Sequence, residues 1–127
     1  MKPVIITNNP KVQEKYNTEF KVIFRPELDQ TDILKEARDY IHLGARLIMH
    51  PMMGRIKPHE TPYKSVFLQT GGSDTHFDSI LMIEDSLLET EKFLKHTAGV
   101  KYDDTLLDDL QFIDLQLLGS GIEEFRR

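Results

Sequence analysis

Short apolar runs alternate along the chain with longer stretches in which apolar residues recur every three or four positions. The short runs contain β-branched or aromatic residues, as is typical of strands buried on both faces. Proline or paired glycine follows each run within three residues and would end a strand there. We therefore predict four short strands, at residues 4–7, 20–24, 46–49 and 65–70.

Two helices are predicted in the first half of the chain. Asn9 and Pro10 suit the N-cap and the first position of a short helix. The polar residues 29–32 offer a second cap, which precedes an amphipathic stripe over residues 33–41. Gly44 suits the position just after a helix, where glycine adopts a left-handed conformation easily.

Two further helices are predicted in the second half. Thr75 and Asp78 fit a capping box, with Asp in place of the usual Glu or Gln, for a helix over residues 77–95. The last segment has apolar residues at helical spacing, but residues 111–118 also alternate as a strand would. We favour a helix there because the segment is long and Asp103 supplies a cap.

The order of elements predicts a single α/β domain over residues 1–127. Right-handed crossovers give a three-layer sandwich with a small, mainly parallel sheet of about four strands in the order 2-1-3-4, flanked by helices. The direction of the fourth strand stays open, because the helix-free connection 50–64 fits either sense. Ligands of such sheets bind beyond the carboxyl ends of the strands, where the winding reverses. Loops 7–10 and 50–64 would meet there.

Composition narrows the class of protein. A hydrophobic content of 39% and a charged content of 29% indicate a folded, soluble domain and not a disordered chain. No apolar run approaches the roughly 20 residues that span a bilayer, and the N-terminus lacks the features of a signal peptide, so we expect a cytoplasmic protein without membrane contact. The absence of cysteine excludes disulfides and thiol chemistry. The net charge of −5 argues against nucleic acid as a partner.

The loop 50–64 differs in charge and shape from the rest of the chain. Residues 46–64 contain four Lys or Arg and one Glu, a local charge of +3 that leaves −8 elsewhere. Three prolines and a glycine give the loop a defined path. We therefore predict a binding site for a small anionic metabolite, formed by Asn8, Asn9, His50, Arg55, Lys57, Thr61, Tyr63 and Lys64.

Each of these residues also has a structural interpretation. Asn8 and Asn9 either recognise a ligand or serve only as caps and turn formers. His50 is either a general base or a histidine that organises the loop through its backbone. The basic residues either clamp an anion or form a solvated surface, and Tyr63 either offers its hydroxyl or packs under the loop. No nucleophile–base set, metal-ligand spacing or nucleotide motif is visible, so we assign no catalytic residue, metal or cofactor.

The C-terminal segment has more apolar residues than one buried helix face needs. Eight of them lie between residues 106 and 118. An apolar width of this kind suggests a helix covered on two sides, and we expect a homodimer. Residues 103–127 also carry seven acids against two arginines, which form a solvated face or a surface for a basic partner.

Several segments of the chain resemble one protein family. They are residues 4–12, 38–42, 83–86 and, as the most specific part, His50-Pro51-x-x-Gly54-x-x-Lys57-Pro58-x-Glu60-Thr61-Pro62-Tyr63-Lys64-Ser65. Together they resemble the GrdX family, whose members are encoded beside the glycine, sarcosine and betaine reductase components of amino-acid-fermenting anaerobes. The resemblance implies a cytoplasmic accessory protein of reductive amino-acid metabolism. It supplies no catalytic residues.

Three hypotheses for the function follow. The first is a small protein that binds an anionic metabolite at loop 50–64. The second is an interaction module that assists assembly of the reductase, with reductase subunits as partners of the last helix. The third is a small enzyme with His50 as base and Arg55 or Lys57 holding an oxyanion.

Overall fold

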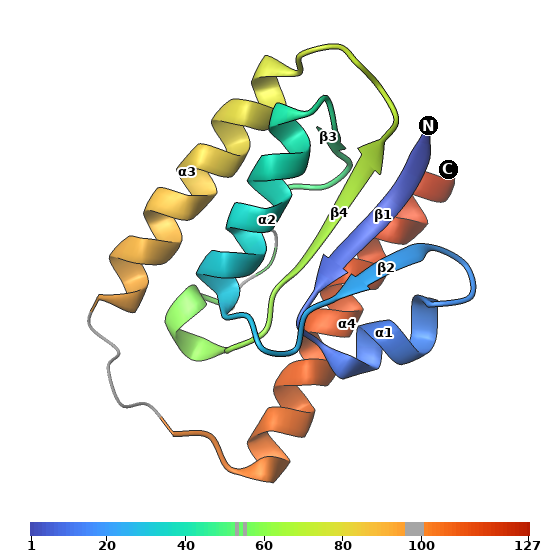
Figure 1. The fold of residues 1–127 in the computed structure, drawn as a ribbon. Coiled ribbons are helices and arrows are strands. Elements are labelled where there is room, and N and C mark those ends of the chain that lie inside the picture. The colour runs from blue at the N-terminus through green and yellow to red at the C-terminus, as the bar shows by residue number, and fades with distance from the viewer. Residues whose placement is uncertain (53, 55, 96–100) are drawn as a thin grey trace.

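The computed structural model describes residues 1–52, 54, 56–95 and 101–127 (Figure 1). The elements are β1 (Lys2–Thr7), α1 (Pro10–Tyr16), β2 (Lys21–Phe24), α2 (Gln30–His42), β3 (Arg46–Leu47), the 3-10 turn η1 (Pro58–Glu60), β4 (Ser65–Thr70), α3 (Phe77–Leu94) and α4 (Asp104–Arg126).

The strands form one mixed sheet in the order β2-β1-β4-β3. β1 and β2 are parallel, whereas β4 is antiparallel to both β1 and β3. The ladder between β1 and β4 runs from Lys2 opposite Thr70 to Thr7 opposite Ser65. The α/β class is confirmed, but the predicted order 2-1-3-4 and the mainly parallel sheet are wrong.

Strand length explains the correction. The first four residues of β4, Ser65–Leu68, are buried, so this strand suits the centre of the sheet. β3 has only two residues, and its Arg46 is exposed, which suits a short edge strand. β4 runs beside β3 in the opposite direction, and its other edge pairs with β1.

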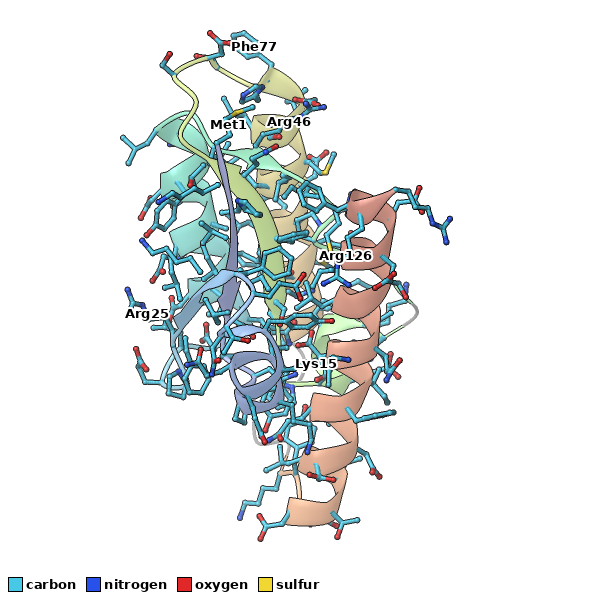
Figure 2. The ribbon with its side chains drawn as sticks, turned by 90° about the vertical axis from the view of Figure 1, so that its right-hand side faces the viewer. Met1, Lys15, Arg25, Arg46, Phe77 and Arg126 are labelled. Carbon is cyan, nitrogen blue, oxygen red and sulfur yellow. The ribbon has the colours of Figure 1, made fainter. Side chains whose placement is uncertain are left out.

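Helices cover both faces of the sheet. On one face, α2 and α3 pack their buried residues against Val4, Ile6 and Val66. On the other face, α1 and α4 pack against Ile5 and Phe67. Figure 2 shows α2 and α4 on opposite sides of the sheet. The predicted three-layer arrangement is therefore present despite the changed strand order.

The first two helices begin as predicted, and the second is followed by the predicted glycine. Asn9 caps α1 by accepting a hydrogen bond from the Lys11 N–H, and Pro10 is the first helical residue. Asp29 caps α2 by accepting from the Asp32 N–H at 2.8 Å. Gly44 follows α2 with φ of +106°, a left-handed conformation that residues other than glycine adopt at a cost.

The third helix differs from its prediction. Its N-cap is His76, without a side-chain cap bond, so the capping box at Thr75 is wrong. Its inner face carries Ile83 and Leu87 together with small polar residues, whereas Phe77, Leu81 and Leu88 are 72%, 66% and 66% exposed. An apolar stripe therefore lies on the solvent side of α3.

The last segment is a helix, which decides against the strand alternative for residues 111–118. Asp103 caps α4 by accepting from the Leu106 N–H at 2.8 Å. Leu110, Leu118 and Ile122 are buried, while Phe112 remains 53% exposed. None of the helices in the described part of the chain has the length and apolar content needed to cross a membrane.

Candidate functional site

The carboxyl end of β1 lies beside the start of β4. The Asn8 N–H donates to the Lys64 carbonyl at 3.3 Å, and the Lys64 N–H donates to Asn8 Oδ1 at 2.9 Å. The two loops that the sequence predicts to meet are therefore in contact. They meet through β4 and not through β3, because β4 is antiparallel and begins where β1 ends.

Asn8 uses its whole side-chain amide to join three loops. Its Nδ2 donates to the carbonyl oxygens of Leu28 and Pro62, both at 3.0 Å. Its Oδ1 accepts from the Lys64 N–H, as described above. With an exposed fraction of 6%, the residue acts as an internal link between the loops that follow β1, β2 and η1.

Asn9 is equally occupied, and it connects α1 to α4. Its Nδ2 donates to the Gln111 carbonyl at 2.8 Å and to Asp114 Oδ2 at 2.9 Å. Its Oδ1 caps α1 through the Lys11 N–H at 3.0 Å. The contacts of both asparagines are those of the structural interpretation, and each Nδ2 gives both of its N–H donors to the protein.

Buried hydroxyl groups continue this network to α4. The Asn9 N–H donates to Thr7 Oγ1 at 2.9 Å, and Thr7 Oγ1 lies 2.7 Å from Ser65 Oγ. Ser65 Oγ donates to Asp114 Oδ2 at 2.7 Å. Because Ser65 gives its single hydroxyl proton to the carboxylate, the Thr7 hydroxyl donates to Ser65.

Asp114 is an acid in a desolvated position. Burial raises the pKa of its carboxyl group, while hydrogen bonds from Asn9 and Ser65 and the charge of Lys64 oppose that rise. Both hydrogen bonds reach Oδ2. In the described part of the chain, no donor lies within hydrogen-bond distance of Oδ1.

Lys64 is a base in a similar position. Burial lowers the pKa of its ammonium group, while the charges of Asp114 and Glu89 act in the opposite direction. Its Nζ donates to the Pro51 carbonyl at 2.8 Å and lies 3.9 Å from Met52 Sδ. Among the described residues, no ion pair or hydrogen bond joins Lys64 to Asp114.

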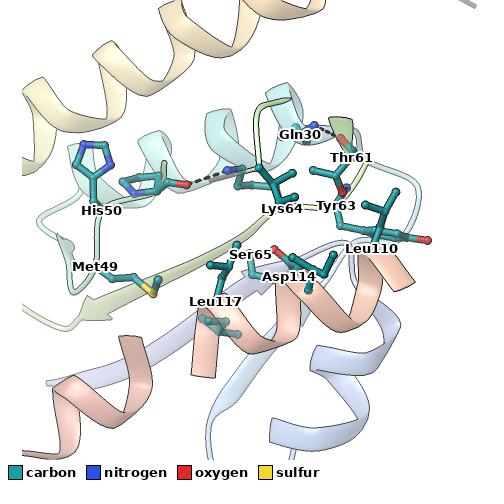
Figure 3. A pocket seen from close by; sticks show the side chains of 14 residues that line it. Gln30, Met49, His50, Thr61, Tyr63, Lys64, Ser65, Leu110, Asp114 and Leu117 are labelled. Atoms are coloured by element: carbon teal, nitrogen blue, oxygen red, sulfur yellow. Dashed lines mark hydrogen bonds between the residues drawn. The ribbon is translucent and has the colours of Figure 1, made fainter. Parts of the chain in front are cut away.

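A small cavity separates the two charged groups. Figure 3 shows the Lys64 side chain on one wall and the Asp114 carboxylate on the wall formed by α4. The cavity has a volume of about 30 Å³, more than the roughly 10–15 Å³ that one water needs. Its lining also includes Gln30, Met49, His50, Thr61, Tyr63, Ser65, Leu110 and Leu117.

Gln30 adds an acceptor without a donor to this lining. Its Nε2 donates to the carbonyl oxygens of Pro58, at 2.7 Å, and of Thr61. These two carbonyls fix the amide orientation, because a reversed amide would set oxygen against oxygen. Its Oε1 is buried and has no partner in the described part of the chain.

The other predicted site residues divide into two groups. Tyr63 and Thr61 line the cavity. The Tyr63 hydroxyl accepts from Gln111 Nε2 at 2.7 Å, which leaves its own proton available. Thr61 Oγ1 accepts from the Tyr63 N–H at 3.2 Å.

His50 belongs to the lining of the cavity, whereas Lys57 does not. His50 is exposed, its Nδ1 accepts from the Met52 N–H at 3.0 Å, and its ring points away from Asp114 in Figure 3. Lys57 Nζ lies 5.7 Å from the centre of the Phe93 ring, outside the cavity lining. The predicted role of Arg55 falls outside the described residues.

Sequence reasoning missed Asp114 and Gln30. Asp114 stood among apolar residues of an ambiguous segment, where the apolar spacing alone was considered. A single acid on the inner face of a helix was the available signal. Gln30 was treated as part of a helix cap, and nothing in the sequence indicates that its oxygen remains without a partner.

The chemistry of the site is that of two opposite charges facing a small polar space. Within the described ranges, no group of three or more His, Cys, Asp or Glu is placed to hold a metal ion. The residues can instead bind charged groups directly: Lys64 an anion, and Asp114 a donor or cation.

Comparison with known proteins bears on the family. Searches among curated proteins and among solved structures gave no match. A sequence model of the GrdX-like proteins matches residues 4–123, which include every element that forms the cavity. The chain therefore belongs to the GrdX-like protein family.

Proposed function

We propose that this protein binds a small anionic metabolite in the cavity beside Lys64. The observation that supports the proposal best is the ammonium group itself, which lines the cavity with one oxygen partner at 2.8 Å. An ammonium ion removed from water is costly unless it is paired. A bound carboxylate or phosphate would supply the missing partner and favour the charged form.

We also propose a cellular setting. The protein would be a cytoplasmic accessory protein of glycine, sarcosine and betaine reduction, and its membership of the GrdX-like family supports this setting. A binding protein of this kind would sense or carry a metabolite of that pathway. No catalytic role is needed for it, and the His50 side chain, which holds the loop backbone, lends no support to a general base.

A thermal-shift experiment tests binding. Acetate, phosphate and acetyl phosphate are added at millimolar concentration, and the midpoint of unfolding is measured. A ligand present at about 100 times its Kd should raise the unfolding free energy by about 2.7 kcal/mol. Lys64→Met should remove the shift while keeping the length of the side chain. The exposed Lys35→Met is the matched control and should keep the shift. No shift with any of the anions would contradict the proposal.

We propose as a second function that the protein docks to another protein through its outer helices. The exposed stripe of Phe77, Leu81 and Leu88 on α3 and the exposed Phe112 on α4 favour it. A second copy or a reductase subunit would cover such a surface. Size-exclusion chromatography with light scattering and co-purification of reductase subunits test it, using Leu81→Asp and Phe112→Asp. A monomer that captures no subunit would contradict this function.

A further inference from the structure

We propose that the ligand of the cavity is a small zwitterion, an amino acid of the size of glycine, held by Lys64 at its carboxylate and by Asp114 at its ammonium group. The inference rests on the proposed binding of an anion beside Lys64. It adds the second charge of the ligand and therefore its chemical class.

The two charges of the cavity are the first argument. Lys64 and Asp114 both line it, yet neither contacts the other among the described residues. A ligand with an anion alone would satisfy Lys64 and add a second negative charge near Asp114. A ligand with a cation alone would do the reverse. A zwitterion gives each buried charge an opposite partner, which is the arrangement that desolvated charges require.

Unoccupied acceptors are the second argument. Asp114 receives both of its hydrogen bonds at Oδ2, from Asn9 and Ser65. Among the described residues, both hydrogen bonds to Asp114 end at Oδ2, which leaves Oδ1 open to water or a ligand, and Gln30 Oε1 is buried without a donor. A primary ammonium group has three N–H donors and can supply such acceptors. A ligand with only anionic groups would leave them without a partner.

The size of the cavity is the third argument. The enclosed volume of about 30 Å³ holds about two water-sized atoms, and the cavity is partly open beyond it. Met49, Leu110 and Leu117 form an apolar part of the lining, against which a short carbon backbone can pack. A ligand of few heavy atoms, such as an α-amino acid with a single carbon between its charges, therefore suits the cavity better than a larger one.

Isothermal titration calorimetry with matched ligands tests the class. The probes are glycine, acetate, methylamine and trimethylglycine, each at neutral pH. Acetate and methylamine each lack one charge, and trimethylglycine keeps both charges but has no N–H donor. We expect glycine to bind at least tenfold more tightly than each of the other three. Equal affinity for glycine and acetate would overturn the inference and leave anion binding intact.

Variants separate the two charges. Asp114→Asn should weaken glycine at least tenfold and leave acetate unchanged or stronger, whereas Lys64→Met should weaken both. Asp109→Asn, an exposed acid on the same helix, is the matched control and should change neither. Unchanged glycine affinity in folded Asp114→Asn would overturn the inference. If Asp114→Asn does not fold, the ligand series on the unmodified protein still decides. Absence of binding by both glycine and acetate would contradict the proposed function as well.

Discussion

Asn8 and Lys64 exchange backbone and side-chain hydrogen bonds, yet their polar groups are used in different ways. Every donor and acceptor of the Asn8 amide is bonded to the backbone of another loop. The Lys64 ammonium group has one carbonyl partner and faces a cavity, across which Asp114 keeps one carboxylate oxygen without a donor among the described residues. The Asn8 side chain is fully bonded within the fold, whereas the Lys64 ammonium group can donate to a further partner.

This difference divides the predicted site residues into those that hold the fold together and those that can bind a ligand. A buried polar group that is fully bonded stabilises the native structure, and its removal costs stability. A charged group that stays incompletely bonded lowers stability and is retained where a ligand completes it. The comparison therefore predicts that variants of the first kind unfold more readily, whereas variants of the second kind stay folded and lose binding.

Asn8→Ala should have the largest effect on stability. The change removes three hydrogen bonds at a residue that is 6% exposed and leaves two carbonyls and one N–H unpaired. At about 1 kcal/mol for each bond, we expect a loss of about 3 kcal/mol. Urea denaturation followed by circular dichroism measures it.

The matched control is the exposed Asn17→Ala, which should change the unfolding free energy by less than about 0.5 kcal/mol. A loss below 0.5 kcal/mol for Asn8→Ala as well would mean that its contacts do not hold the three loops together, and the contrast with Lys64 would fail.

Local signals in the sequence predicted the helices better than the sheet. Asn9, Asp29 and Gly44 act at the ends of helices because capping depends on a few neighbouring residues. Strand order depends on which distant strands pair, and no periodicity records that. The polar start of β3 at Arg46 was visible in the sequence, but the strand predicted over residues 46–49 spans only two residues, whereas all six residues of β4 pair with β1.

Part of the cavity lining comes from residues that the sequence had singled out. Lys64, Tyr63 and Thr61 stand in the unusual loop, so composition alone drew attention to them. Asp114 comes from a helix 50 residues further along, and its proximity is a property of how α4 packs across β4 and β1. Long-range packing of this kind supplied the second charge, which changed the expected ligand from an anion to a zwitterion.

Ser65→Ala tests the hydroxyl network and should have a smaller effect on the unfolding free energy than Asn8→Ala. The change removes a buried donor to Asp114 and a partner of Thr7, so we expect a loss of about 1–2 kcal/mol. Removal of the donor should also raise the pKa of Asp114 further, since one of the groups that stabilise its charged form is lost. Urea denaturation measures the loss, and the exposed Ser73→Ala is the control. Equal values for both variants would contradict a structural role for the network.

The pH dependence of the unfolding free energy of Asp114→Asn tests how burial affects the charge of Asp114. Burial raises the pKa of Asp114 in the folded protein above the value of about 3.9 in the unfolded chain. The folded state then holds the proton more tightly, so this residue contributes stability at low pH and loses that contribution as pH rises through the folded pKa. Relative to wild type, Asp114→Asn should therefore gain stability as pH rises from about 4.

Urea denaturation between pH 4 and pH 8 measures this difference, and Asp109→Asn reports the effect of removing an exposed charge from α4. If the wild type instead gains stability relative to Asp114→Asn as pH rises, the hydrogen bonds and the charge of Lys64 outweigh the effect of burial on the pKa of Asp114.

His50→Ala should have the smallest effect, and it tests where the site ends. His50 is exposed, and its ring accepts one hydrogen bond from the Met52 backbone, so we expect a loss of less than about 0.5 kcal/mol. Because the ring points away from Asp114, glycine affinity should change by less than threefold (Figure 3). Calorimetry on the variant measures both the folding transition and the binding. A tenfold loss of affinity with an unchanged unfolding transition would add His50 to the residues that bind the ligand. It would also support the hypothesis that this histidine acts on the ligand.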